Sequence, residues 1–547
     1  MSNILVSVKN QKAKEYPIGV SLYEICEALN INDKILGAKI NNELTPLTTR
    51  LIKDTSVEFI DVTDLAGYKM YQAGLKFIFE VALKELYPEL EVCYEHSVPR
   101  GILAEVIGDI TITERDLAKV KGIMFNIIDD DLLFEQYNIS KKDAIEYFNN
   151  KKEYEKAKNI KDSNETIIRL FKLKEELNYF YTSMPYSTKP ISKFEMVYLG
   201  NNRLVFTFPS ARTNGKVPEY VHHKNIIDSF LEGKKWLEQM NIPYLADLNK
   251  LISSSNINDI IQSNELLFNM QIANCAEQIA KNREKKIVLV AGPSSSGKTT
   301  TTKRIASYLK VKGLKPVMIS IDDYFVDRVK TPKDANGEYD YECLMAININ
   351  KFNKDLNDLL NGKTIRLPRY DFVYGKSELT NKEVSLTENG VILIEGLHAL
   401  NDDLTPQINE MFKYKIYLSP FIPLNIDRHN YISTLDLRLL RRIIRDNRYR
   451  GMSVSDTIEL WQNVRNGEER YIFPFIHQAD TIINTALVYE LGVVRVYAEP
   501  LLYSVELDSP YYEEARRLIT FLKRFYMIPT EYIPKDSILR EFIGFVD

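Results

Sequence analysis

One stretch constrains the fold more than any other part of the 547-residue chain, namely Gly292-Pro293-Ser294-Ser295-Ser296-Gly297-Lys298-Thr299. It follows a β-branched apolar run at 286–291 and precedes a predicted helix at 300–311. The two glycines let backbone N–H groups curl around a phosphate, and the helix N-terminus adds partial positive charge. The order strand, G-x-x-x-x-G-K-T, helix therefore predicts a phosphate-binding loop in an α/β domain.

The loop predicts ATP and Mg²⁺ as ligands. Lys298 would contact the β- and γ-phosphates, and the Thr299 hydroxyl would bind Mg²⁺. A later apolar strand at 391–394 ends at Glu395, a carboxylate placed to bind the Mg²⁺ water shell or, alternatively, to form a simple turn. The residues expected to bind ATP are Gly292, Pro293, Ser294, Ser295, Ser296, Gly297, Lys298, Thr299 and Thr300.

A second predicted strand, 317–321, is followed by Asp322 and Asp323. Because the carboxyl ends of parallel strands meet at the ligand crevice, Asp322 could accept a proton from an attacking hydroxyl. The alternative is a solvated turn.

Arginines are concentrated on one predicted helix, which begins near Asp436. Their spacing of three and four residues aligns them along one stripe, beside a phosphate-binding loop. We interpret the helix as a mobile lid that neutralises phosphate charge. Arg438 and Arg442 of this helix are also expected to serve catalysis, together with Lys298 of the loop. Contact with RNA and a plain solvated face are the alternatives. The arginines are Arg438, Arg441, Arg442, Arg445, Arg448 and Arg450.

Composition excludes several other classes of protein. Lys and Arg total 71 against 75 Asp and Glu, so the net charge of -4 favours neither DNA nor an anionic membrane. No apolar run reaches the roughly 18 residues of a membrane helix. The four cysteines are far apart and include no C-x-x-C pair. We expect a cytoplasmic multidomain protein.

Residues 285 to about 485 resemble uridine kinase, within the uridine kinase and phosphoribulokinase group. The matching stretches are 292–300, 320–325, 368–373, 394–397, 436–446 and 479–483. The resemblance implies that Asp322 is the general base for a nucleoside 5′-hydroxyl. It also implies that Tyr370 and Arg438 contact the substrate, and that Glu342, or the nearby Asp340, binds the ribose hydroxyls.

The chain departs from that family at two positions. Uridine kinases carry a histidine that faces the base five residues after the tyrosine, where this chain has Gly375. They usually continue the lid with Arg-Gly-Arg, whereas this chain has Arg450-Gly451-Met452. Phosphate transfer is compatible with both changes, but uridine specificity is not implied.

The amino-terminal half resembles modules of a different family. Residues 1–62 resemble a TGS domain, a β-grasp module, and 63–215 resemble the α+β editing domain of threonyl-tRNA synthetases. The clearest editing-like piece is a helix ending at 82–88. The two histidines of that helix would fall on Ala73 and Phe77, so aminoacyl-tRNA hydrolysis is not expected. Contact of this half with RNA, a protein or a small ligand stays open.

The predicted organisation has five parts. After the TGS-like and editing-like modules come a helical connector (216–280), a P-loop kinase domain with a parallel sheet and helices on both faces (281–490), and a carboxyl-terminal extension packed on it (491–547). Local patterns predict a capping box at Ser21 and exposed helices across 140–182, including 167–173. The charge run 151–156 is interpreted as a solvated helix face.

These observations favour an ATP-dependent kinase whose acceptor is a nucleoside. A kinase for another small hydroxyl compound is the alternative within enzymes. A regulator that uses the nucleotide to switch RNA or protein contacts of the TGS-like module is the alternative from another class. The oligomeric state is not predicted.

Overall fold

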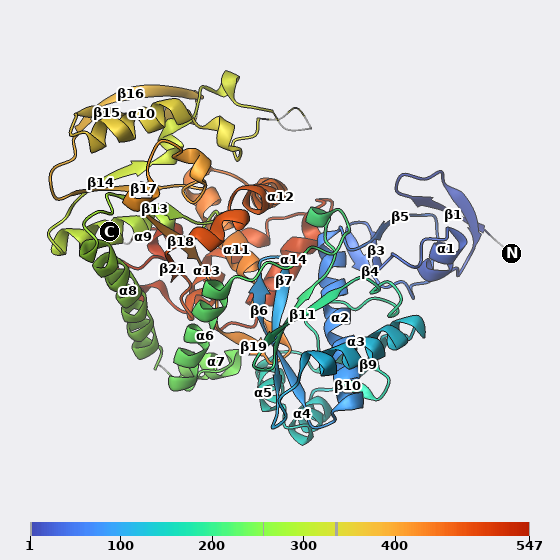
Figure 1. The fold of residues 1–547 in the computed structure, drawn as a ribbon. Coiled ribbons are helices and arrows are strands. Elements are labelled where there is room, and N and C mark those ends of the chain that lie inside the picture. The colour runs from blue at the N-terminus through green and yellow to red at the C-terminus, as the bar shows by residue number, and fades with distance from the viewer. Residues whose placement is uncertain (1–2, 255, 334–336, 338, 373, 546–547) are drawn as a thin grey trace.

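The computed structural model describes residues 3–254, 256–333, 337, 339–372 and 374–545. A five-stranded parallel sheet lies in the left half of Figure 1, in the order β14-β17-β13-β18-β21. Its strands are β13 (Ile287–Ala291), β14 (Lys315–Ser320), β17 (Gly390–Glu395), β18 (Lys413–Ser419) and β21 (Thr481–Asn484). The parallel sheet expected around the phosphate-binding loop is therefore confirmed.

Helices cover both faces of this sheet, as predicted. Val288 and Val290 of β13 belong to one hydrophobic core, while Ile287 and Leu289 belong to another. The first core contains residues of α8 (Ile257–Lys281), α9 (Lys298–Val311), α11 (Thr434–Arg450), α12 (Val454–Tyr471) and α13 (Glu490–Leu502). The second contains residues of α6 (Lys224–Gln239), α10 (Ile349–Leu360) and β15 (Ile365–Asp371), which pairs with β16 (Lys376–Val384).

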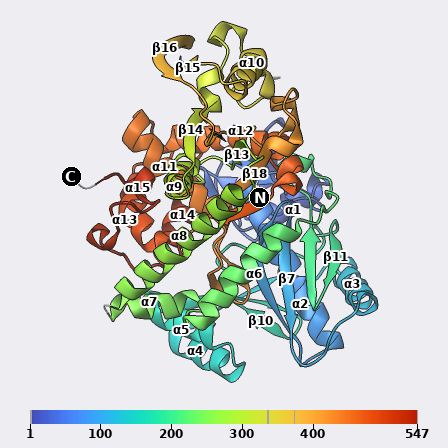
Figure 2. The same cartoon turned by 60° about the vertical axis from the view of Figure 1, so that its left-hand side comes forward.

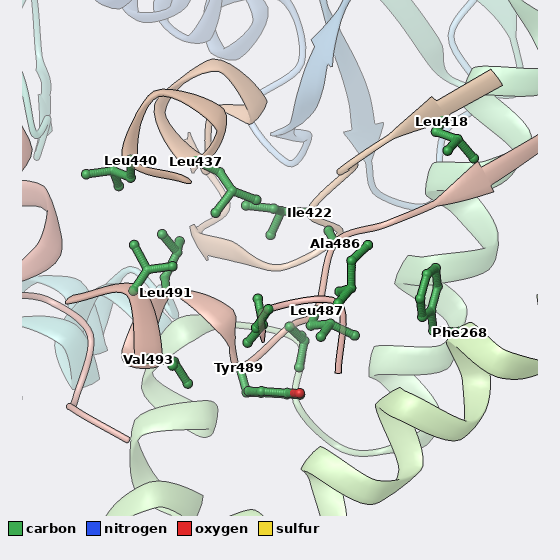
Figure 3. Close-up of a cluster of buried hydrophobic side chains, with 14 of the residues drawn as sticks. Phe268, Leu418, Ile422, Leu437, Leu440, Ala486, Leu487, Tyr489, Leu491 and Val493 are labelled. Carbon is green, nitrogen blue, oxygen red and sulfur yellow. The ribbon is translucent and has the colours of Figure 1, made fainter. Parts of the chain in front are cut away.

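The first core joins the kinase sheet to its carboxyl-terminal helices. Leu418 of β18, Leu437 of α11 and Leu491 of α13 belong to the same buried cluster (Figure 3). Phe525 is buried there, and Tyr511, Tyr512 and Phe521 pack against it, whereas Tyr503 is exposed. The helix predicted at 487–491 begins only at Glu490. The last helices are α14 (Tyr512–Leu522) and α15 (Arg540–Ile543).

The amino-terminal sheet stands at the right of Figure 1, in the order β2-β1-β5-β3-β4. Ser21 and Glu24 form the predicted capping box of α1, which is stabilised because both orphan N–H groups find acceptors. The elements are β1 (Asn3–Val8), β2 (Lys14–Pro17), α1 (Leu22–Ala28), β3 (Gly37–Ile40), β4 (Glu43–Thr45) and β5 (Thr55–Ile60).

The middle region is built around α2 (Leu65–Leu86), whose apolar stripe is buried. One sheet has the order β11-β12-β7-β6 and another β10-β9-β8. The strands are β6 (Glu91–Val98), β7 (Gly101–Ile107), β8 (Glu135–Ser140), β9 (Ile167–Leu173), β10 (Glu176–Asn178), β11 (Glu195–Gly200) and β12 (Arg203–Thr207). The helices are α3 (Glu114–Asp129), α4 (Lys141–Asn150), α5 (Tyr154–Asp162) and α7 (Leu245–Ser253). Figure 2 shows α6, α7 and α8 running from this region to the kinase sheet.

The prediction of a helix at 167–173 is wrong. These residues form β9, which pairs with β8 and β10 along its length. Ile168 and Leu170 are buried while Ile167 and Arg169 are exposed, which is the two-residue alternation of a strand. Apolar spacing over seven residues fits both periods, and the neighbouring strands decided between them.

The interpretation of 151–156 as a solvated face is also wrong. Glu153, Glu155 and Lys156 are buried. They lie under a hairpin of the kinase half, β19 (Asn425–Asp427) and β20 (Asn430–Tyr431), from which Arg428 binds Glu155. Buried charges persist when they are paired: Glu153 pairs with Lys156, and Glu155 pairs with Arg428, which lies 273 residues away in the sequence.

Candidate active site

The loop between β13 and α9 has the predicted geometry of a phosphate-binding turn. Ser295 and Gly297 have φ values of 59° and 81°, which bend the backbone into a tight curl. At Gly292 a Cβ would lie 2.5 Å from the Leu418 carbonyl, so only glycine fits there. The hydroxyls of Ser295 and Ser296 are buried and make no hydrogen bond within the described residues. These two hydroxyl groups are therefore free to donate hydrogen bonds to a bound anion.

A cavity of about 410 Å³ opens beside the loop and brings together most of the predicted site residues. Loop residues Ser294–Thr299 form one wall. The lining also includes the predicted base, the predicted sugar-binding carboxylate and the predicted Mg²⁺ carboxylate, which are Asp322, Glu342 and Glu395. Asp323, the neighbour of Asp322 in the 3-10 turn Ile321–Tyr324, is not among the residues that line the cavity.

The positive charge of Lys298 acts on all three carboxylates. Burial raises the pKa of each, to about 7 for Glu342 and to about 6 for Glu395. Asp322 adds repulsion to both glutamates, while Lys298 lowers all three pKa values. Buried carboxylates that lie this close together are costly unless cations balance them, and such clusters are typical of functional sites.

Glu395 and Thr299 fit a Mg²⁺ ion that is also bound by phosphate. The Thr299 hydroxyl lies 3.4 Å from Glu395 Oε1, and the Ser320 hydroxyl lies 3.2 Å from it. All of these donors are oxygens, which Mg²⁺ prefers, and the raised pKa of Glu395 would fall on binding a cation. Within the described ranges, no group of three His, Cys, Asp or Glu side chains could hold a metal alone.

The arginine helix is not an exposed lid. In α11, Arg438 and Arg441 are buried and form ion pairs with Glu468 and Glu490. Neither arginine lines the cavity; their guanidinium groups instead donate hydrogen bonds to the loop backbone. Arg438 Nε binds the carbonyl of Ser294 at 2.9 Å, and Arg441 Nη1 binds that of Ser295 at 3.2 Å. This helix therefore supports the loop from behind.

Three other arginines do reach the cavity. Arg442, Arg445 and Arg450 line it, and Arg442 Nη1 donates to the Ser294 hydroxyl at 3.0 Å. Asp446, which is fully buried, pairs with all three. These arginines keep the position that sequence predicted for neutralising phosphate charge, although their helix is anchored.

Part of the cavity lining is aromatic. Phe325, Tyr341 and Phe372 line it. Tyr370, the predicted nucleoside contact, is buried behind them, with ring centroids 5.4 Å from Phe325 and 4.9 Å from Phe372. It does not line the cavity itself. Val373, the last residue of the predicted motif 368–373, lies outside the described residues.

The position of the missing histidine is occupied by a neighbour. Gly375 has φ 66°, and a Cβ there would lie 2.7 Å from Arg328 Cβ. Arg328 crosses this glycine and donates hydrogen bonds to the Tyr341 hydroxyl and the Phe372 carbonyl. Arg328 thus links the two aromatic residues and fills the space that a side chain at position 375 would need.

Sequence reasoning missed Glu468, Glu490 and Glu541. The first two neutralise the buried arginines, and the Ser294 N–H also donates to Glu468 at 3.3 Å. Glu541, in α15, lines the cavity and accepts a hydrogen bond from the Thr300 hydroxyl at 2.6 Å. These acids belong to no motif, so only the expectation that buried arginines need partners could have suggested the first two.

The loop, sheet and carboxylates define a P-loop nucleotide-binding domain. The model of the phosphoribulokinase and uridine kinase family matches residues 287–490. A uridine kinase from Staphylococcus aureus is 31% identical over 199 residues, which are 36% of this chain and 86% of that protein. The chain belongs to this family through its kinase domain.

Solved structures give only distant similarity. A candidate uridine kinase from Bacillus stearothermophilus is 19% identical, with 37% of this chain and 89% of that chain covered and a TM-score of 0.25. A D-glycerate 3-kinase from Cryptococcus neoformans is 16% identical, with 46% and 87% covered and a TM-score of 0.21. The family assignment rests on the sequence match, and residues 1–286 and 491–547 lie outside the region that the family model matches.

Proposed function

We propose that this protein transfers the γ-phosphate of ATP to a hydroxyl group of a small molecule, with a nucleoside 5′-hydroxyl as the first candidate. The observation that carries the proposal is the arrangement of Asp322 and Lys298 in one cavity beside the phosphate-binding loop. A structural ion-pair network would not need an open cavity that holds both a proton acceptor and a phosphate-binding lysine.

The reaction would follow from these positions. The acceptor oxygen attacks the γ-phosphorus, the bond to the β,γ-bridging oxygen breaks, and ADP leaves. Asp322 takes the acceptor's proton, and its pKa, raised by burial, brings the carboxylate closer to the working pH of a general base. Bound Mg²⁺ would supply charge neutralisation, and Thr299 and Glu395 are the residues to hold it.

The cationic side chains would stabilise charge that develops on the transferred group. Lys298 and Arg442 line the cavity, and Arg438 would act by positioning the loop through its bond to Ser294. Donors that are already fixed before the reaction lower the barrier most effectively.

The lining supports an acceptor with a flat ring. Phe325, Tyr341 and Phe372 offer aromatic faces, which stack with planar groups. Glu342 lines the same cavity and would accept hydrogen bonds from sugar hydroxyls. A sugar phosphate without a base would leave these faces uncovered, which is why a nucleoside is the preferred acceptor.

The decisive experiment measures phosphate transfer and ATP affinity for the Asp322→Asn and Asp323→Asn variants of the full chain. Nucleosides, sugars and sugar phosphates serve as acceptors, and RNA alone serves as the control for the regulatory alternative. Asp322→Asn should keep ATP affinity and lose roughly 10²–10⁴ in transfer rate, the usual effect of removing a general base.

Asp323→Asn should transfer phosphate at nearly the normal rate, because Asp323 does not line the cavity. A reversed order of the two variants would assign the base to Asp323. If no acceptor is phosphorylated and ATP turnover responds only to RNA, the kinase proposal fails.

A further inference from the structure

A second cavity, of about 340 Å³, lies between the amino-terminal half and the kinase half. Its walls come from α2, from the first turn of α11, from α12 and from α14. It shares no lining residue with the cavity beside the phosphate-binding loop. Basic side chains outnumber acidic ones in this lining by seven to three.

Two of the three acidic side chains in this interdomain cavity are already bound by basic ones. Asp436 pairs with Lys69 at 3.2 Å and with Arg517 at 2.8 Å. Glu514 also pairs with Arg517, at 2.7 Å. These pairs join α2, α11 and α14 across the rim, and they leave little negative charge to balance the other cations.

Arg465 of α12 is a buried cation with donor atoms that find no acceptor among the described residues. It is 6% exposed, and its Nε and Nη2 atoms are buried with no hydrogen-bond partner among the described residues. Arg212 and Arg438 are nearby cations, and with burial they lower the pKa of Arg465 to about 9. The negative charge of Glu468 acts on Arg465, but Glu468 already binds Arg438 with both carboxylate oxygens.

An unpaired buried guanidinium destabilises a folded protein, so its retention calls for an explanation. Its planar donors match a carboxylate or a phosphate better than any neutral group. Around it, the cavity offers aromatic surface from Tyr68, Phe180 and Trp461.

We propose that the interdomain cavity binds a small organic anion, whose carboxylate or phosphate group pairs with Arg465. The uncharged part of this molecule packs on the aromatic side chains beside it. This ligand is distinct from ATP and from the phosphate acceptor, since the two cavities are separate.

Trp461 reports on this cavity directly. It lines the cavity, and its ring lies 5.2 Å from the guanidinium of Arg438, which holds the phosphate-binding loop. The chain has only two tryptophans, so a Trp236→Phe variant makes Trp461 the sole source of tryptophan fluorescence.

The first test titrates the full-length Trp236→Phe protein with phenyl phosphate and with benzoate, while a non-hydrolysable ATP analogue and Mg²⁺ fill the phosphate-binding loop. Phenol is the neutral control. We expect a saturable fluorescence change with at least one anion and none with phenol, and the two anions distinguish a phosphate site from a carboxylate site.

Arg465→Met in the same background should abolish the response, whereas Arg470→Met, an exposed arginine on the same helix, should retain it. A response that survives Arg465→Met, or an equal response to phenol, would overturn the proposal. So would the absence of saturable binding by both anions.

The second test compares melting temperatures without and with an anion. Without an anion, Arg465→Met should leave the melting temperature unchanged or raise it, because methionine fills the volume without an unpaired charge. Phenyl phosphate or benzoate should then raise the melting temperature of the wild type but not of the variant. A marked loss of stability in Arg465→Met without anion would show that the guanidinium is already satisfied by the protein, and the proposal would fall.

Discussion

Replacing Glu342 by glutamine should stabilise the protein at pH 8 much more than at pH 5. Glu342 packs against Gly467 of α12 so closely that a Cβ atom added at position 467 would lie 2.9 Å from Glu342 Cβ. Burial and the neighbouring Glu468 raise the pKa of its carboxyl from 4.5 to about 7. The folded state therefore holds the proton over a pH range in which the unfolded state has lost it.

The direction of the pH effect follows from proton binding. Below pH 4.5 the group is mostly protonated in both states and has little effect. Between about 4.5 and 7 the folded state binds more protons, so stability falls as the pH rises, and above 7 the loss is constant. At about 1.4 kcal/mol per pKa unit the penalty reaches about 3 kcal/mol at pH 8 and about 1 kcal/mol at pH 5.

Thermal melting of the wild type and of Glu342→Gln at both pH values measures this difference. At about 2–4 °C per kcal/mol for a domain of this size, the gain in melting temperature should be several degrees larger at pH 8. Glu388→Gln, at an exposed glutamate, is the matched control. Equal gains at both pH values, or a loss at pH 8, would refute the reasoning.

Three further outcomes are expected. Lys298→Ala should lose most ATP affinity in calorimetry, whereas Lys303→Ala, at an exposed lysine of the same helix, should bind ATP normally. Normal ATP binding by Lys298→Ala would show that the phosphate-binding loop is wrongly assigned. Competition assays should show weak discrimination among uridine, cytidine and purine nucleosides. Gly375→His should not create a preference for uridine, because a Cβ at position 375 would lie 2.7 Å from Arg328. A wild-type preference for uridine beyond about a thousandfold would show that another residue reads the base. Glu490→Ala should cost about 3–5 kcal/mol in denaturant unfolding, because it leaves the fully buried Arg441 unpaired, and a cost below about 1 kcal/mol would contradict this.

Local patterns alone predicted the phosphate-binding loop, the parallel sheet around it and the capping box at Ser21. Each depends on residues close in the chain: glycines at fixed spacing, a continuous buried strand, or a hydroxyl three residues before a glutamate. The same local information placed Asp322 and Glu395 at strand ends, which the fold then brought to one cavity. Their catalytic and metal-binding roles stay predictions.

Tertiary structure alone decided which polar residues are buried and what they contact. Lys156 and Arg441 look like surface residues in sequence, yet each is fully buried, and Arg441 pairs with Glu490, 49 residues away. Residues 167–173 became a strand because β8 and β10 offered backbone partners. Sequence periodicity shows that a segment has an apolar face, but it does not show which element covers that face. That element depends on chain segments that meet only in the folded protein, and so does the lack of hydrogen-bond partners at Arg465 among the described residues.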